Sequence, residues 1–312
     1  MPASSPVRPS PRTAANITPD HRMTMVTTRG PSGRATLLGT GAIALWSVLA
    51  VLTALAGDLP PFQMTAVTFG IGGLLLALAN LVQGRGFALY RQPAAAWAVG
   101  LGGLFGYHAL YFTALTAAPP AEASLVCYLW PLLIVVGSAL LPGERLRPLH
   151  VLGALLGLGG VAFLLGPKAQ FSLDAMGGYL AALAAAVTWA AYSLASRRFA
   201  AVPSAIVAGY ALGTAVLAAA AHLLFETWVW PAGAGAWAAL AGLGLGPVGA
   251  AFLLWDIGMK RGNPRLLGAL AYAAPLASTL ILIATGKAEA SLGILVACLA
   301  ITLGAILAGR KG

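Results

Sequence analysis

Long apolar stretches, separated by short polar or Pro- and Gly-containing joins, repeat along the chain after residue 33. Each is near the ~20 residues that a helix needs to cross a bilayer. No join exceeds about a dozen residues, which leaves no room for a catalytic domain outside a membrane. The pattern predicts ten transmembrane helices, at residues 34–56, 62–83, 95–117, 121–141, 148–166, 177–199, 204–225, 234–258, 265–285 and 289–308.

The composition supports the same fold class. Of the 312 residues, 59% are hydrophobic and only 8% are charged, whereas a soluble domain carries roughly a quarter charged residues. Such a surface excludes a soluble enzyme, a disordered chain and a disulfide scaffold. The two cysteines, Cys127 and Cys298, lie inside apolar stretches and indicate no redox compartment. We therefore expect an all-α polytopic membrane protein.

Positive charge alternates between the joins. With ten helices, 16 of the 18 Lys and Arg residues fall on one side, and only Lys168 and Lys287 fall on the other. This asymmetry is the positive-inside pattern, so both termini are expected in the cytoplasm. The net charge of +10 thus reflects topology and not nucleic-acid binding. Residues 1–33, rich in Pro, Ser, Thr and Arg, are expected to form a disordered cytoplasmic tail.

The two halves of the chain share landmarks at a nearly constant offset. These pairs predict a first five-helix repeat at 34–166 and a second at 177–308. Because five is odd, the second copy would be inverted relative to the first, as in many secondary transporters. The matched pairs are Trp46 with Trp189 and Pro60 with Pro203 (offset 143), and Pro120 with Pro264, Tyr128 with Tyr272 and Pro131 with Pro275 (offset 144).

The third apolar stretch carries polar rings at helical spacing. Tyr107, His108 and Tyr111 share one helix face. A titratable ring near the middle of a span is costly unless it faces a wet cavity or a partner. His108 is therefore a candidate lining residue and a candidate ion or proton site, and the alternative is a histidine hydrogen-bonded between helices.

Two prolines interrupt corresponding stretches. Pro131 frees the carbonyl of Cys127 from the helical ladder, and Pro275 does the same for Ala271. Freed carbonyls at membrane depth are tolerated where they line a cavity. Each proline marks either such a lining or a simple packing kink.

Aromatic residues fall into two groups. Trp97, Trp228, Trp230 and Trp237 lie at the ends of stretches, where tryptophan anchors a helix at the interface. A deeper group recurs at related positions in both halves and is expected to line a central cavity. Its members are Trp46, Tyr111, Tyr128, Trp130, Trp189, Tyr192, Trp255 and Tyr272.

Apart from Glu122 and Glu289, which stand at the very start of their spans, Asp256 is the only acid within a predicted span. Lys260 follows four residues later on the same helix face. We favour a structural ion pair near the interface at the cytoplasmic end, with a proton or substrate-amine site as the alternative. Glu144, beside Arg145 and Arg147, is expected to lie in a solvated cytoplasmic turn.

Several chemistries have no signature in the sequence. No phosphate-binding loop for ATP, no metal-binding motif and no serine nucleophile elbow is present. We therefore expect no enzyme activity, no cofactor and no bound metal.

Ten helices in two repeats, with a proline-bearing fourth helix, resemble the EamA type of the drug/metabolite transporter superfamily. The strings Tyr107-His-Ala-Leu-Tyr111-Phe and Tyr128-Leu-Trp130-Pro131 resemble a branch of bacterial exporters of aromatic amino acids. The resemblance covers residues 34–308. It implies a multi-pass protein of the bacterial inner membrane that exports amino acids through a central cavity without ATP hydrolysis.

The substrate-binding residues expected from the resemblance and from the deep aromatic group are Trp46, Tyr107, His108, Tyr111, Tyr128, Trp130, Pro131, Trp189, Tyr192, Trp255, Tyr272 and Pro275. The expected partners are small-molecule substrates and the lipid bilayer. The oligomeric state stays open and is compatible with a monomer. The alternatives are an exporter of cationic drugs, for which Asp256 is the only carboxylate candidate, a carrier of other small metabolites, and a channel.

Overall fold

The computed structural model describes residues 31–142, 144–165, 170–284 and 292–309, and within these ranges the chain is helical with no strand. The predicted tail lies outside the described residues up to position 30, as do the joins at 166–169 and 285–291. The all-α fold class is confirmed.

The first half of the chain ends at the apolar helix α8. Its elements are α1 (Gly33–Trp46), α2 (Leu49–Ala56), α3 (Pro61–Val82), η1 (Phe87–Tyr90), α4 (Ala94–Leu101), η2 (Gly102–Gly106), α5 (Tyr107–Ala117), α6 (Pro120–Cys127), α7 (Trp130–Gly137), η3 (Ser138–Leu140) and α8 (Pro148–Leu165).

The second half follows the same order. Its elements are η5 (Leu173–Ala175), α9 (Met176–Ser196), η6 (Arg197–Phe199), η7 (Ser204–Ile206), α10 (Val207–Phe225), α11 (Gly233–Leu243), η8 (Gly244–Ala250), α12 (Ala251–Arg261), α13 (Pro264–Ala271), α14 (Ala273–Ala284) and α15 (Leu292–Gly309).

Eight helical stretches in the described part are long and apolar enough to cross a membrane. Two further apolar helices, at Pro148–Leu164 and Leu292–Ala308, are shorter. The chain is therefore a multi-pass membrane protein by length and composition of its helices.

Irregular segments fall at matching places in the two halves. The π-helical segment η2 interrupts the stretch from α4 to α5, and η8 interrupts the stretch from α11 to α12. Likewise Tyr128 ends α6 and Tyr272 ends α13, each just before a proline-bearing helix. These breaks put the same interruption of the helical ladder into each half.

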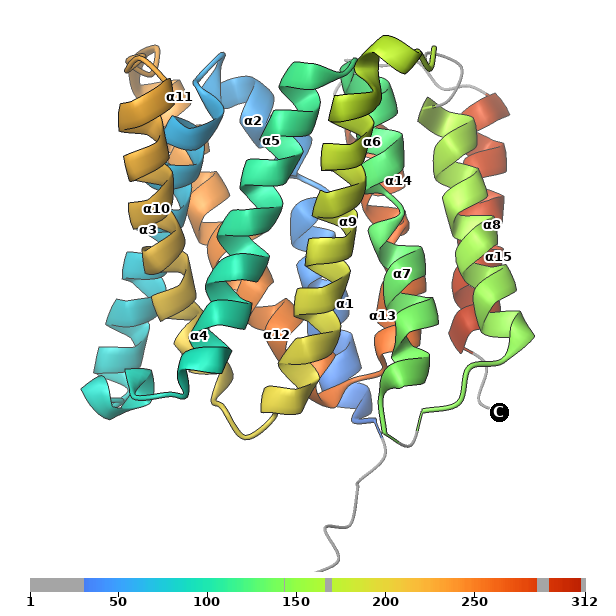
Figure 1. Ribbon diagram of the computed structural model, residues 1–312, viewed down its shortest axis with the longest axis horizontal. Helices are drawn as coiled ribbons and strands as arrows, with labels where there is room; N and C mark the ends of the chain where they lie inside the picture. Colours follow the sequence, from blue (N-terminus) through green and yellow to red (C-terminus); the bar gives the residue numbers. More distant parts are fainter. Residues whose placement is uncertain (1–30, 143, 166–169, 285–291, 310–312) are drawn as a thin grey trace, which may run out of the picture. The chain divides into compact units, whose positions relative to one another are not determined.

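The two halves pack through one another. Helix α1 packs along α12, and its counterpart α9 packs along α5, while α3 lies against α10 and α8 against α15 (Figure 1). Each of these contacts joins the first half to the second, so neither half forms a separate hydrophobic core. The largest cluster of buried residues draws on both halves.

The first stretch is broken where the sequence predicts one continuous helix. Helix α1 ends at Trp46, and α2 begins at Leu49. At the break, the Ser47 hydroxyl donates to the carbonyl of Ile43 (3.1 Å). A serine that bonds back to the preceding turn competes with the helical ladder and often bends a helix.

Candidate functional site

Four tryptophans from four helices meet at the centre of the core. Trp46 ends α1, Trp130 begins α7, Trp189 lies on α9 and Trp255 on α12. Their ring centroids lie between 5.2 and 6.4 Å apart. Trp189 and Trp255 are 3% and 0% exposed, and Trp130 is 8% exposed. We call these residues the tryptophan cluster.

Two of the indole N–H groups are fixed by hydrogen bonds. Trp46 Nε1 donates to the carbonyl of Pro247 (3.0 Å), and Trp255 Nε1 donates to the hydroxyl of Ser193 (3.0 Å). A buried indole needs such a partner, and the bond sets the tilt of the ring. The carbonyl of Pro247 belongs to the π-helical segment η8, so this irregular segment helps to orient the cluster.

Helix α5 adds two half-buried phenols to the cluster. The rings of Tyr107 and Tyr111 stack at 5.9 Å, and the Tyr107 ring lies 5.2 Å from Trp189. The Tyr107 hydroxyl lies 3.6 Å from the Cys127 sulfur, and the Tyr111 hydroxyl lies 3.1 Å from that of Ser124. Both phenols are thereby tied to α6.

His108 lies beside these phenols and faces two phenylalanines. Its ring meets Phe69 edge-on at 5.0 Å and Phe252 at 6.2 Å. Its Nδ1 lies 2.7 Å from the carbonyl oxygen of Leu104. Since a carbonyl can only accept, Nδ1 carries the proton, and the Nε2 of neutral His108 is left as an acceptor. With Tyr107 and Tyr111, His108 forms the half-buried rim of the tryptophan cluster.

Tyr192 is a further predicted residue that lies at the tryptophan cluster. Its ring lies 5.3 Å from Trp189, and the residue is 4% exposed. The predicted residues at one site are thus Trp46, Tyr107, His108, Tyr111, Trp130, Trp189, Tyr192 and Trp255.

The other predicted residues lie at the helix breaks. Tyr128 and Tyr272 belong to a smaller cluster with Val161 and Ile301, from α8 and α15. The backbone N–H of Leu132, in the first turn of α7, donates to the Tyr272 hydroxyl (3.1 Å). Tyr272 therefore satisfies one of the N–H groups that every helix start leaves without a partner.

Both prolines lie near the starts of their helices. Pro131 is in the first turn of α7 and is buried, and Pro275 lies near the start of α14. Proline is well tolerated there, because the first N–H groups of a helix have no partner in the ladder. The Pro275 carbonyl accepts from the hydroxyl of Thr279 (2.9 Å).

Asp256 and Lys260 form the predicted ion pair. Asp256 Oδ2 lies 2.8 Å from Lys260 Nζ, and the two side chains are 1% and 3% exposed. The Lys260 Nζ also donates to the carbonyl of Val202 (3.0 Å). The contact is confirmed, and it is buried rather than interfacial.

Glu144 is not in a solvated turn, so that prediction is wrong. Its carboxylate lies 3.3 Å from Arg197 and 2.9 Å from Arg265, and its side chain is 7% exposed. The Arg197 guanidinium also donates to the carbonyls of Met259 (3.3 Å) and Gly262 (2.8 Å). We call Glu144, Arg197 and Arg265 the ionic network. It ties the join after η3 to the ends of α9, α12 and α13.

Two segments of the chain, residues 33–166 and 176–310, match the model of the EamA-like transporter family. The match takes in every residue of the tryptophan cluster and its rim. The chain belongs to the EamA-like transporter family.

Individual relatives cover most of this EamA chain. It is 57% identical over 277 residues to the aromatic amino acid exporter YddG of Ancylobacter novellus. The aligned region covers 88% of this chain and 96% of that protein. The aromatic amino acid exporter YddG of Salmonella typhimurium is 27% identical over 270 residues, 80% of this chain and 87% of that one. A solved crystal structure with 56% identity superposes with a TM-score of 0.85, covering 88% of this chain and 97% of that chain.

The sequence prediction missed further residues at the candidate site. Phe69 on α3 and Phe252 on α12 stack at 5.3 Å and close one side of the cluster. Phe252 lies 144 positions after His108, so the repeat offset carries a signal for it. Phe69 has no such signal, because a lone Phe in an apolar stretch does not differ from a lipid-facing one.

The described part of the chain holds no group of three or more His, Cys, Asp or Glu side chains that could bind a metal ion. The polar groups around the rings are hydroxyls, one imidazole and one thiol. They suit weak hydrogen bonding and ring contact with an organic solute, not coordination chemistry.

Proposed function

We propose that this EamA chain is a secondary transporter that exports aromatic amino acids from the bacterial cytoplasm across the inner membrane. The single observation that carries the proposal is the tryptophan cluster with its rim of Tyr107, His108 and Tyr111, built by helices from both repeats. Two relatives of this chain are named aromatic amino acid exporters. Other neutral amino acids are expected to pass less well.

The rings suit the proposed substrate. Each offset or edge-to-face contact between rings is worth about 0.5–1.5 kcal/mol. The Nε2 of neutral His108 adds an acceptor for an N–H group of the substrate. Several weak contacts give moderate affinity, which transport requires because a tightly held substrate would not leave.

We propose ten transmembrane helices in two inverted repeats. Helices α8 and α15 are shorter than the eight helical stretches that are long enough to cross a membrane. They nevertheless run beside the other helices at the same height (Figure 1). They also approach closely, because a Cβ at Gly153 would contact the carbonyl oxygen of Gly304. Small residues commonly permit such contact between membrane helices.

We place the ionic network at the cytoplasmic end and the half-buried rim on the path to the outside. Positive charge gathers in the joins on the side of Arg197 and Arg265, as the positive-inside rule expects. In this conformation the network draws the ends of α9, α12 and α13 together. Alternating access would open this end while the outer end closes.

Transport into proteoliposomes that contain only the purified chain tests the proposal. Labelled tryptophan, phenylalanine, threonine and a quaternary ammonium compound are compared, with and without a pH gradient. We expect tryptophan and phenylalanine to move faster than threonine in the absence of nucleotide.

Movement of the quaternary ammonium compound without movement of tryptophan would instead favour a cationic drug exporter. That mechanism needs a carboxylate free to exchange a proton for the cation. The buried carboxylate of Asp256 is paired with Lys260 at 2.8 Å, which argues against it.

A further inference from the structure

One pair of oppositely charged side chains lies beside the tryptophan cluster and takes no part in its ring contacts. Asp256 directly follows Trp255 of the tryptophan cluster, and Lys260 lies one helical turn further on. The pair is buried among apolar helices. Charges at such a place are expensive, and apolar residues of similar volume would often stabilise the fold as well or better. A buried pair next to a substrate site therefore calls for a functional explanation.

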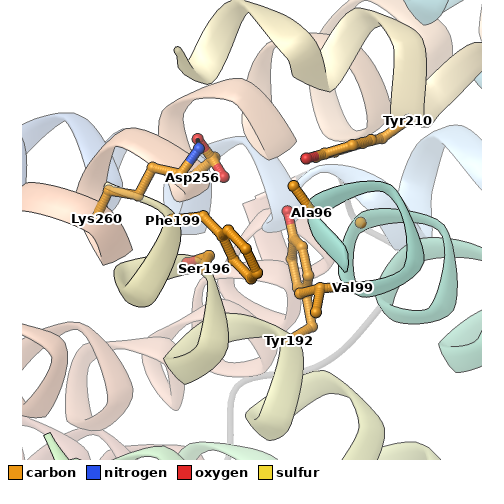
Figure 2. A pocket seen from close by; sticks show the side chains of 9 residues that line it. Ala96, Val99, Tyr192, Ser196, Phe199, Tyr210, Asp256 and Lys260 are labelled. Atoms are coloured by element: carbon orange, nitrogen blue, oxygen red, sulfur yellow. Dashed lines mark ion pairs between the residues drawn. The ribbon is translucent and has the colours of Figure 1, made fainter. Parts of the chain in front are cut away.

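The pair opens onto a small cavity. Figure 2 shows Asp256 and Lys260 on one side of it, with the hydroxyls of Tyr192 and Tyr210 directed towards the space beside the carboxylate. The volume is about 10 Å³, which is near the minimum that holds one water molecule. Among the residues that the structure describes, the buried Tyr192 hydroxyl has no hydrogen-bond partner. Polar binding capacity is thus left over at this place.

Close packing on α4 and η2 sets the two phenols. A Cβ at Gly100 would overlap the ring of Tyr210, and a Cβ at Gly103 would overlap the ring of Tyr192. Tyr192 also contacts Trp189, so one side chain joins the cavity to the tryptophan cluster. A solute whose ring lies at the cluster could reach the charges with its other end.

We propose that Asp256 and Lys260 form a loading site for the head group of an α-amino acid, which carries one positive and one negative charge. The carboxylate of Asp256 takes the α-ammonium, and the Nζ of Lys260 takes the α-carboxylate. This inference rests on the proposed function and names the part of the substrate that the rings do not read. No covalent step is involved.

The energetics of exchange support this use of the pair. Separating two buried charges without replacement leaves each unpaired and is strongly unfavourable. A zwitterion inserted between them gives each charge a new partner and adds charge-assisted hydrogen bonds. Asp256 and Lys260 would therefore stay paired without substrate. They would separate when a head group that carries both a positive and a negative charge is present. Since the cavity admits no more than a water, α4 and α9 must separate here for loading.

The two repeats differ at this point. Residues 144 positions before Asp256 and Lys260 are Phe112 and Thr116, which carry no charge. In an inverted repeat, corresponding positions lie at opposite faces of the membrane. A charged loading site at the Lys260 end alone, which we place at the cytoplasmic face, fits a protein that accepts its substrate on one side and releases it on the other.

The test compares three indole compounds in proteoliposomes. Tryptophan carries both charges, tryptamine lacks the carboxylate, and indole-3-propionate lacks the ammonium. The informative variant is the double change D256N/K260M, because it removes both charges and leaves no buried charge unpaired. Its folding is checked by size-exclusion chromatography and by its thermal midpoint in detergent. Lys260→Arg serves as the conservative variant that keeps the charge.

We expect the unaltered protein to prefer tryptophan over both analogues by about 10- to 100-fold in kcat/KM, the range for loss of a charge-assisted hydrogen bond. In D256N/K260M this preference should fall to within about threefold, chiefly through a higher KM for tryptophan at the cytoplasmic face. Lys260→Arg should retain most of the preference.

An unchanged preference in a folded D256N/K260M protein would overturn the inference, as would an equal loss of transport for all three compounds. Failure of the unaltered protein to move tryptophan at all would instead overturn the proposed function. The two failures are therefore distinguishable. A double variant that does not fold is replaced by single-site Lys260→Arg and Lys260→Gln, and equal head-group preference in these two would also overturn the inference.

Discussion

Trp46 and Trp189 occupy corresponding positions in the two repeats, and their ring centroids lie 5.9 Å apart. His108 and Phe252 also correspond, and their rings lie 6.2 Å apart. Residues related by the internal duplication thus meet each other in the centre of the protein. An axis that relates the two halves would pass through the tryptophan cluster, where a substrate could contact both repeats at once.

Shortening Trp130 tests the cluster. Trp130 contacts Trp46, Trp189 and Trp255. Because each ring contact is worth about 0.5–1.5 kcal/mol, Trp130→Ala should lower tryptophan efflux by about tenfold or more. Trp130→Phe keeps an aromatic ring and should retain most of the activity. Initial efflux rates from proteoliposomes measure both, and equal activity in the two variants and the unaltered protein would remove Trp130 from the site.

Gly103 is expected to tolerate no side chain. A Cβ there would overlap the ring of Tyr192, whereas at the neighbouring Gly102 it would meet nothing within 4 Å. Forcing extra volume into a packed core costs about 1–3 kcal/mol. Gly103→Ala should therefore lower the thermal midpoint in detergent by several degrees and slow transport, while Gly102→Ala should do neither. Equal midpoints for the two variants would contradict the packing described.

Tyr272 should contribute to stability and not to ring recognition. Its hydroxyl accepts the N–H of Leu132 at 3.1 Å. Tyr272→Phe leaves that N–H without a partner, at a cost of about 1–3 kcal/mol. We expect a lower thermal midpoint with an unchanged order of preference among tryptophan, phenylalanine and threonine. Tyr128→Phe, the same change in the other repeat, is the matched control, and an altered order in Tyr272→Phe alone would assign Tyr272 to the site.

Glu144 should hold closed the end of the protein that we place at the cytoplasm. Glu144→Gln removes the carboxylate that joins Arg197 and Arg265, so the population open to the cytoplasm should rise. The measurement is the rate at which a membrane-impermeant maleimide labels a cysteine introduced at the buried Ser196, in inside-out vesicles. We expect severalfold faster labelling than in the parent cysteine variant.

Arg147→Gln, a neutralising change on the same join at an exposed side chain, is the control and should leave labelling unchanged. Labelling that is equal in the Glu144 and Arg147 variants would show that the ionic network does not hold this end.

The sequence predicts the long apolar helices, of which the described part of the chain has eight, because they follow from long runs of apolar residues. The position of a residue along its helix can be read in the same way, and eight of the twelve predicted residues meet at one site. The face of a helix cannot, since an apolar stretch gives little periodic contrast. Tyr128 and Tyr272 therefore pack against residues of α8 and α15, although the sequence groups them with the cluster.

The partners of charged residues are also hidden from the sequence. Glu144 stands beside two arginines in the chain, yet its carboxylate reaches Arg197 and Arg265 from distant helices. Its local surroundings resemble an ordinary polar turn. Asp256 and Lys260 were predictable because both partners lie on one helix at a spacing of four residues.

The most direct test of the account is tryptophan counterflow in proteoliposomes that hold only the purified chain. Vesicles loaded with excess unlabelled tryptophan are diluted into labelled tryptophan, without nucleotide and without a pH gradient. We expect transient accumulation of label above its equilibrium level, which phenylalanine inside the vesicles should also support. Vesicles that gain no more label than protein-free vesicles would contradict it.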